Sequence, residues 1–241
     1  TYTGAVTLGA DTTLTASSIT TGSTIAAGAN SLTLITDGLA LGGNVNGGAG
    51  TLTIKPKTAA TTIGLGSGGN ASGATLQLDD TELGYINVAS NYFAAIVIGD
   101  ATNVTGGTGT LKYDTNANQN FHSTLTLQSY SGAITSYDQL DVSSSKNLTI
   151  NSGGAVSLST INTANVLAVT GTGITLNGSV TTTGTQTYTG AVTLGSDITL
   201  TTTAASTSGD ITFSSTVEGV SSPSSSYSLT ATTAADAHTI F

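Results

Sequence analysis

The chain has 241 residues, of which 37% are hydrophobic, 5% aromatic and only 7% charged. With thirteen acidic residues, four lysines and no arginine, its formal net charge is −9, which excludes the basic surface that binding to nucleic acid or to an anionic membrane requires. Cysteine is absent, which excludes disulfides, a thiolate nucleophile and a cysteine metal site. No run of about 18 apolar residues is present, so we expect no membrane insertion of this segment.

One segment of the chain occurs almost twice. Residues 1–16 read TYTGAVTLGADTTLTA and residues 187–202 read TYTGAVTLGSDITLTT, so thirteen of sixteen positions agree. Recurrence at this distance is typical of a repeat architecture. Within the segment, two short runs of alternating apolar and polar residues flank Gly195, a pattern that indicates strand, turn and strand.

Similar runs, rich in Thr, Val and Ile, follow one another along the chain, and Gly, Asn, Asp or Ser separates them. In chain order, the predicted strands are residues 5–8, 12–15, 31–35, 51–54, 61–65, 75–78, 95–98, 110–113, 123–127, 139–142, 147–150, 155–158, 166–170, 173–176, 191–194, 197–201, 209–213 and 226–230.

Two all-β architectures are compatible with these strands, an antiparallel sandwich and a β-solenoid. Few aromatics, two prolines and a long-range repeat favour the solenoid. At roughly 20–25 residues per coil we predict about ten to twelve coils, and a rod about 50 Å long at ~4.8 Å per strand. Residues 1–220 are assigned to the solenoid, and 221–241 to a Ser-rich loop and a terminal coil that continues it or frays. Because residue 1 falls directly into a repeat, we expect a piece of a longer protein.

One stretch departs from the strand pattern. Asp79, Asp80 and Glu82 precede Leu83 and Ile86 at helical spacing, and Asp80 is the predicted cap of a single helical turn. The three acids are also the candidates for a calcium site, since oxygen ligands suffice for that ion. We favour a solvated helix cap over a metal site by about four to one, and we assign no other metal ligand.

Two further patterns contain the residues of known functional sites but lack the surrounding features that those sites require. Residues 64–69 match the GxGxxG spacing of nucleotide-binding loops, but an alternating strand follows instead of a helix, so a glycine corner is favoured. His122, Ser123 and Asp114 contain the residue types of a catalytic triad, which only geometry can establish. His122 and His238 have no neighbours at metal-ligand spacing. We therefore predict no catalytic residue and no cofactor.

Several surface features remain open. Five tyrosines are a candidate sugar-stacking surface, although filling of coil ends is at least as good an interpretation. Thr-x-Thr pairs occur at irregular intervals, and regular arrays of such pairs bind ice. The tyrosines are Tyr2, Tyr113, Tyr130, Tyr137 and Tyr188, the Thr-x-Thr pairs begin at Thr1, Thr13, Thr51 and Thr187, and the sequons, interpreted as corner asparagines that stack as internal ladders, are at Asn70, Asn103, Asn147 and Asn177.

Some of these units resemble a known family. NGSVTTTG at 177–184, QTYTGAV at 186–192 and SGDITF at 208–213 are similar to repeats of filamentous-haemagglutinin-like proteins, and residues 62–86 with Ile98-Gly99 resemble a unit often found upstream of them. These are giant bacterial adhesins, exported by two-partner secretion or as autotransporter-like passengers. The resemblance covers most of residues 1–215 and implies a right-handed parallel β-helix, surface display and an adhesive or fibre-forming role. It transfers no catalytic residue.

We therefore expect a non-enzymatic, stiff β-helical stalk in a secreted bacterial cell-surface or extracellular-fibre protein. Its expected partners are other copies of itself, end to end or laterally, and cell-surface or matrix glycans. The alternatives are a polysaccharide-degrading β-helix enzyme, against which scattered lysines and absent arginine weigh, and a glycan-binding or ice-binding module.

Overall fold

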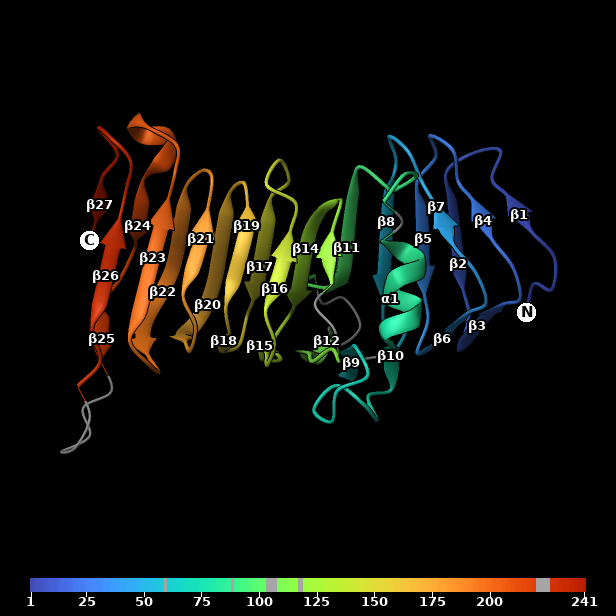
Figure 1. Cartoon of the computed structure of the whole chain (residues 1–241). Coiled ribbons are helices and arrows are strands. Elements are labelled where there is room, and N and C mark those ends of the chain that lie inside the picture. The colour runs from blue at the N-terminus through green and yellow to red at the C-terminus, as the bar shows by residue number, and fades with distance from the viewer. Residues whose placement is uncertain (59, 88, 103–107, 117–118, 220–225) are drawn as a thin grey trace.

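In a computed structural model, the chain winds into a three-sided coil that repeats along a rod (Figure 1). The structure describes residues 1–58, 60–87, 89–102, 108–116, 119–219 and 226–241. Within them every strand pairing is parallel, and the stacked strands form a β-solenoid of about ten turns. The predicted all-β parallel β-helix is therefore confirmed, with the number of turns at the lower end of the predicted range.

Strands at the same position in successive coils form one face of the rod. Face A contains β1 (Val6–Thr7), β4 (Ile25–Ala26), β7 (Val45–Asn46), β13 (Asn120–Phe121), β16 (Leu140–Val142), β19 (Ile161–Ala164), β21 (Val180–Thr182), β23 (Ile198–Thr202) and β26 (Leu229–Thr232). Face B contains β2 (Thr12–Thr15), β5 (Leu32–Ile35), β8 (Thr51–Lys55), β11 (Ala95–Asp100), β14 (Thr124–Ser129), β17 (Leu148–Ser152), the first halves of β20 (Leu167–Leu176) and β22 (Gln186–Leu194), β24 (Ile211–Phe213) and β27 (Thr239–Ile240). Face C contains β3 (Ser18–Thr21), β6 (Gly38–Leu41), β10 (Leu76–Leu78), β9 (Thr61–Leu65), β12 (Thr108–Tyr113), β15 (Ile134–Ser136), β18 (Val156–Leu158), the second halves of β20 and β22, and β25 (Val217–Gly219).

Apolar side chains fill the inside of the coil because alternate residues of a strand point to opposite sides of its sheet. Leu34 of β5 pairs with Ile54 of β8, and both are fully buried. Each such residue contributes about 1.5–3 kcal/mol. Towards the C-terminal end the filling becomes aromatic, where Tyr188, Phe213 and Phe241 stack with successive ring centroids 5.2 Å apart.

The outward side of face B carries a regular column of side chains. Seven of its ten positions are threonine, although the Thr-x-Thr pairs are irregularly spaced in the sequence. Variable numbers of residues are absorbed at the corners, so the strands themselves stay in register at about 4.7–4.9 Å. We name this set the threonine column: Thr13, Thr33, Thr53, Val97, Thr126, Thr149, Ala168, Thr187, Thr212 and Ile240.

An insertion between β8 and β11 leaves face B unbroken. β9 and β10 pair in parallel and close a small additional coil beside face C. The chain then forms the helix α1 (Asp80–Ile86) before it returns to face B. There Ala95 pairs with Thr51, which lies 44 residues earlier.

Helix α1 packs against β6, β7 and β10 and takes the place of a strand in face A (Figure 1). Its C-cap residue Asn87 connects the helix to β13, because the Asn87 side chain donates to the Asn120 carbonyl at 2.5 Å and accepts from the His122 amide at 2.9 Å. The predicted single turn capped by Asp80 is corrected to a helix of seven residues capped by Asp79. The physical reason is the spacing, since a capping box joins an N-cap to the acid three residues later, here Glu82.

The two near-identical segments lie on different faces. In the first copy (residues 1–16), β1 belongs to face A and β2 to face B. In the second copy (residues 187–202), the matching strands lie one face earlier in the order A, B, C, namely in face C and face A. Beyond them, β26 and β27 pair with β23 and β24 and continue the stack. Most of the predicted Ser-rich loop, residues 221–225, lies outside the described residues.

Candidate functional site

Side-chain oxygens at the coil corners accept hydrogen bonds from backbone amides of a neighbouring coil. Asp11 accepts from the Ser31 amide and Asp197 from the Ser228 amide, both at 2.8 Å. These two corners are exposed, so each bond alone contributes only modestly to stability, and together such bonds join one coil to the next. The same role falls to Ser31, Asp37, Ser136, Ser179 and Asp210.

Three aspartates gather at the corner between faces C and A, where β10, β12 and β15 end. We name Asp80, Asp114 and Asp138 the acidic corner. Asp114 Oδ2 accepts from the Asn70 amide at 2.7 Å, and Asp138 Oδ2 accepts from the Thr115 amide at 2.8 Å. The acidic corner is thus built from the same bonds as the other corners, with more acids in one place.

The Asp114 and Asp138 side chains also share a hydrogen bond. Burial raises the pKa of both carboxyls, but the bonds that Asp114 accepts, first from Asn70, outweigh burial and lower the pKa of Asp114 overall. For Asp138, burial together with the hydrogen bond and charge of Asp114 raises the pKa, and Asp80 adds to the rise. Asp114 is therefore the stronger acid of the two, and Asp138 is the one that takes up a proton first as the pH falls.

A protonated carboxyl beside a carboxylate has the chemistry of an acid–base pair. Glycoside hydrolysis, however, needs two carboxyl groups roughly 5–10 Å apart, whereas a direct hydrogen bond brings their oxygens to about 2.5–3.0 Å. Only Asp80 is a third carboxylate at this corner, and it accepts from the Ser67 and Asn116 amides at 3.3 and 3.2 Å. The geometry favours a proton-sharing pair that stabilises the corner.

Sequence reasoning did not find this pair. It placed Asp114 in a possible triad and did not single out Asp138. The available signal is the dipeptide Tyr-Asp, which occurs at 113–114 and again at 137–138. The repeat comes one coil later at the end of the same face, since β12 pairs with β15.

The three residues predicted as calcium candidates have two different structural roles: Asp79 and Glu82 cap helix α1, and Asp80 belongs to the acidic corner. Asp79 accepts from the Glu82 amide at 2.8 Å, and Glu82 accepts from the amides of Asp79 and Leu41 at 3.1 and 2.8 Å. Asp80 faces the acidic corner instead. Burial raises the pKa of Glu82. In the described residues no group of three or more His, Asp or Glu side chains is arranged to hold a metal ion, so the arrangement supports the helix cap.

The predicted triad residues do not meet. Ser123 is buried and its hydroxyl donates to the Phe93 carbonyl at 2.7 Å. The His122 ring nitrogen Nδ1 lies 3.3 Å from the Ser143 hydroxyl, and Asp114 belongs to the acidic corner. His238, the other histidine, pairs with Asp210 at 3.4 Å.

The GxGxxG segment is a turn, as predicted. Gly66 has φ +108°, and its amide donates to the Leu78 carbonyl at 2.8 Å. Gly68 donates to the Asp114 carbonyl at 2.8 Å, and its α-carbon lies so close to that residue that a Cβ would stand 2.2 Å from the carboxylate. The strand β10 follows the turn, so no helix N-terminus is placed to receive a phosphate.

The predicted tyrosine surface is wrong for two of its five members. Tyr113 and Tyr188 are fully buried, and burial raises the pKa of Tyr113 to about 12. Tyr2, Tyr130 and Tyr137 are 41%, 47% and 44% exposed. They follow or precede different strands and form no single platform. Filling of the coil is therefore the correct interpretation for the two buried rings.

The asparagine ladders are external instead of internal. Asn147 and Asn177 are exposed; Asn147 accepts from the Asn165 side chain at 3.1 Å, and Asn177 donates to the Ser157 hydroxyl at 2.9 Å. Asn70 lies at the acidic corner, and Asn103 lies outside the described residues. An internal ladder fails because the coil interior is filled with apolar side chains.

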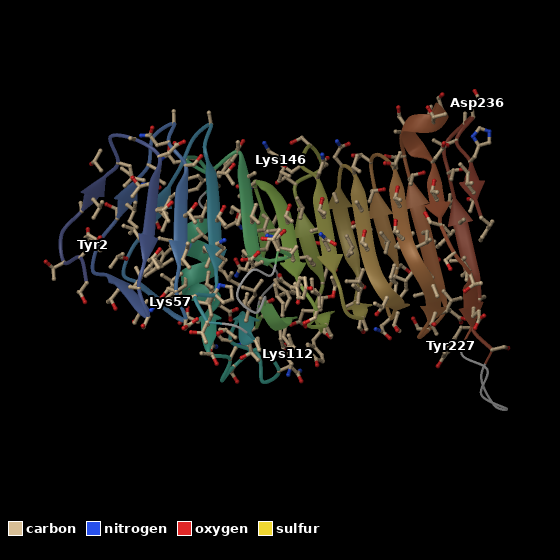
Figure 2. The ribbon with its side chains drawn as sticks, turned by 180° about the vertical axis from the view of Figure 1, so that it is seen from behind. Tyr2, Lys57, Lys112, Lys146, Tyr227 and Asp236 are labelled. Atoms are coloured by element: carbon tan, nitrogen blue, oxygen red, sulfur yellow. The ribbon has the colours of Figure 1, made fainter. Side chains whose placement is uncertain are left out.

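The lysines are dispersed along the rod. Lys55 pairs with Asp100 at 3.4 Å, and Figure 2 shows Lys57, Lys112 and Lys146 well separated from one another. The dispersion inferred from the sequence is therefore confirmed for these residues, and none of them gathers into a basic patch.

The fold defines the class of protein, a parallel β-helix whose corner aspartates and serines join the coils. Compared with protein-family models, with curated proteins and with solved structures, the chain matches none. No helix in the described ranges has the length and apolar character to cross a membrane.

Proposed function

We propose that this chain is a stiff structural segment of a secreted bacterial cell-surface or extracellular-fibre protein. The observation that supports the proposal is the use of its polar side chains. At successive corners, oxygens of Asp11, Asp114, Asp138 and Asp197 each accept a hydrogen bond from a backbone amide of another coil. Side chains bound in this way hold the stack together.

Stiffness follows from continuity. The parallel ladder of face B joins each coil to the next over the described length, and the buried apolar residues form one cluster inside the coil. Ten strands at about 4.8 Å give a rod of about 45–50 Å. Such a rod bends only if ladder bonds and core contacts are broken together, which makes it suitable as a stalk.

Surface display, export by two-partner secretion or an autotransporter-like route, and adhesion to cell-surface or matrix glycans are the parts of the proposal that rest on the resemblance to filamentous-haemagglutinin-like repeats. The exposed threonine and asparagine side chains of the rod are compatible with contacts to glycans, because hydroxyl and amide groups both donate and accept hydrogen bonds.

End-to-end contact between copies is a further part of the proposal, and the two edges of the described stack are suited to receive another coil, whether of a longer chain or of a second copy. At one end Phe241 is 75% exposed and continues the buried ring column. At the other, a hollow of about 390 Å³ is lined by residues that include Tyr2, Leu14 and Ile19. A second coil seated on either end would pair the open strand edges.

Single-molecule pulling from the two termini tests the stalk. We expect a series of ruptures, each releasing about 20 residues or roughly 70 Å of chain, because coils detach one at a time. Smooth extension at low force would contradict the proposal. Antibodies against residues 1–241 provide the cellular test, since the proposal requires them to label intact cells of the source bacterium.

Polysaccharide hydrolysis is the second candidate, because the acidic corner holds three carboxyl groups and the pKa of one of them, Asp138, is raised by burial and by Asp114. In that function Asp138 would act as the general acid and Asp80 as the base, since Asp114 lies too close to Asp138 to admit a water between them. Release of reducing ends from acidic or neutral polysaccharides, abolished by Asp138→Asn and retained by Asp197→Asn as a corner control, would establish it. Absence of release over the same panel would leave the structural proposal in place.

A further inference from the structure

Face B is the one face of the rod that no insertion interrupts. α1 takes a place in face A, and the inserted strands β9 and β10 are part of face C. In face B, ten strands from β2 to β27 follow one another, and Thr53 pairs directly with Val97 across the insertion. The face presents the threonine column along its whole length.

Face B is also nearly free of charge. The protein carries a net charge of −9, yet the face B strands contain only two charged residues in the described chain, Lys55 and Asp100, and these pair with each other at 3.4 Å. Acids lie at the corners instead, as Asp114 and Asp138 do. A neutral face on an acidic rod is the surface on which two like-charged copies can meet with the least repulsion.

We propose that face B is a lateral contact surface for a second copy of this chain, packed side by side and antiparallel. The proposal rests on the proposed stalk function and names the face through which copies would associate. Charge favours a second copy as the occupant, because that copy brings the same nearly neutral face. A self-complementary patch is what a two-fold dimer requires.

The area sets the strength of the contact. Ten strands at about 4.8 Å, each presenting about four residues at 3.3 Å, give roughly 600 Å² per copy and about 1,200 Å² for the pair. That value lies at the lower limit of stable interfaces, so a pair of single chains associates weakly. In a longer rod, each additional coil that pairs in register would enlarge the contact area by the same amount.

Charge favours one orientation. In a parallel two-fold arrangement the strand direction reverses across the contact, so Lys55 of one copy would face Thr51 of the other, and the two lysines would lie on the same strand level about 13 Å apart. In an antiparallel arrangement the third strand of face B, β8, faces the eighth, β22, so Lys55 lies opposite Thr189 and the two lysines are about 24 Å apart. The repulsion between the two lysines is therefore weaker in the antiparallel pair.

Sedimentation velocity on the purified chain tests the pairing. At about 100 µM we expect a monomer–dimer mixture, and more dimer as salt rises from 0.05 to about 0.5 M, because screening weakens the repulsion between acidic rods. The double variant T126E/T149E places charges at the centre of the column and should weaken dimerisation at least tenfold. Its matched control T135E/S157E carries the same charges on paired strands of face C and should change the dissociation constant less than twofold.

A spin label reports the orientation without any added charge. Because the chain has no cysteine, T33C takes a single nitroxide, and antiparallel pairing places the two labels about 35 Å apart, while a label at T149C lies within about 20 Å of its partner. Short distances at both positions, equal losses in both charge variants, or a monomer up to about 1 mM would overturn the proposal. So would a monomer that binds glycans or ice through face B. A monomer that still unfolds coil by coil under force would leave the stalk function intact.

Discussion

The first copy and the second copy of the repeated segment have thirteen of sixteen residues in common but different places in the rod. Val6 lies in face A, whereas its equivalent Val192 lies in face C. Leu14 lies in face B, whereas its equivalent Leu200 lies in face A. Alternation of apolar and polar residues therefore decides which side chains point inward, but not which face a strand joins.

Burial differs as much as position. Tyr2 of the first copy is 41% exposed, and its equivalent Tyr188 is fully buried. The second copy has a coil on each side, because β22 pairs with both β20 and β24. In the described structure the first copy is covered on one side only. The same residues thus contribute very different amounts of stability, and the difference comes from the neighbouring coils.

The largest effect is expected from the tyrosines. Tyr188→Ala removes a buried ring that stacks on Phe213 and donates to Gln186 at 3.0 Å, and should lower the free energy of unfolding by about 3–5 kcal/mol. Tyr2→Ala should change it by less than about 0.5 kcal/mol. Denaturant unfolding of both variants measures the contrast, and equal losses would contradict the assigned burial.

The next largest effect on stability is expected at Gly190, compared with its equivalent in the first copy, Gly4. Gly190 has φ +138°, and a Cβ there would stand 2.2 Å from the Gly171 carbonyl oxygen, so Gly190→Ala should destabilise by about 1–3 kcal/mol. Gly4 has no atom within 4 Å of a Cβ. Gly4→Ala should therefore be neutral or slightly stabilising in thermal melts. A larger loss at Gly4 than at Gly190 would reverse the comparison.

Converting the first copy into the second is a sharper test. The triple variant Ala10→Ser, Thr12→Ile, Ala16→Thr makes the two segments identical. Thr12 is half-buried opposite Leu32, so isoleucine should stabilise by about 0.5–1 kcal/mol. Hydrogen exchange should still show β2 protected by its ladder to β5. Loss of that protection would mean that the segment itself selects its face.

The smallest effect concerns pH. Hydrogen bonds from the Ser228 amide and hydroxyl lower the pKa of Asp197. A carboxyl with a lowered folded-state pKa contributes stability above its unfolded value of 3.8, and that contribution is lost as the pH falls through the folded-state pKa. The melting temperature of Asp197→Ala should therefore lie below that of the parent at pH 6–7, and the two should converge as the pH falls below 3.8 and through the folded-state pKa. A constant difference across this range would refute the assignment.

Much of the fold could be predicted, because the alternation of apolar and polar residues can be recognised within the sequence of each single strand. The predicted strands at residues 12–15 and 61–65 coincide with β2 and β9. β6 was missed because Gly38-Leu39-Ala40-Leu41 follows Asp37 and has the composition of a turn. Two-residue strands such as β4 and β7 are too short to show a period at all.

The acidic corner and the threonine column could not be predicted, because the register between paired strands joins residues that lie far apart in the sequence. Partner residues lie 20 positions apart between Thr33 and Thr53, 44 between Thr51 and Ala95, and 18 between Ile174 and Val192. Without these offsets the sequence cannot bring Asp138 to Asp114, nor show that scattered threonines form one column. Corner lengths decide both, and corners carry little periodic signal.

The most direct test of the stacked coil is a disulfide across the insertion. Thr53 and Val97 are 44 positions apart but paired in adjacent strands, at a spacing that a disulfide can bridge. Under native oxidising conditions the T53C/V97C variant should form an intramolecular bond, detected as a cross-linked peptide by mass spectrometry, whereas T53C/T149C, three coils apart, should stay reduced. Free thiols in the folded T53C/V97C protein, or a bond in T53C/T149C, would contradict the coil register on which the stalk, the threonine column and the acidic corner all depend.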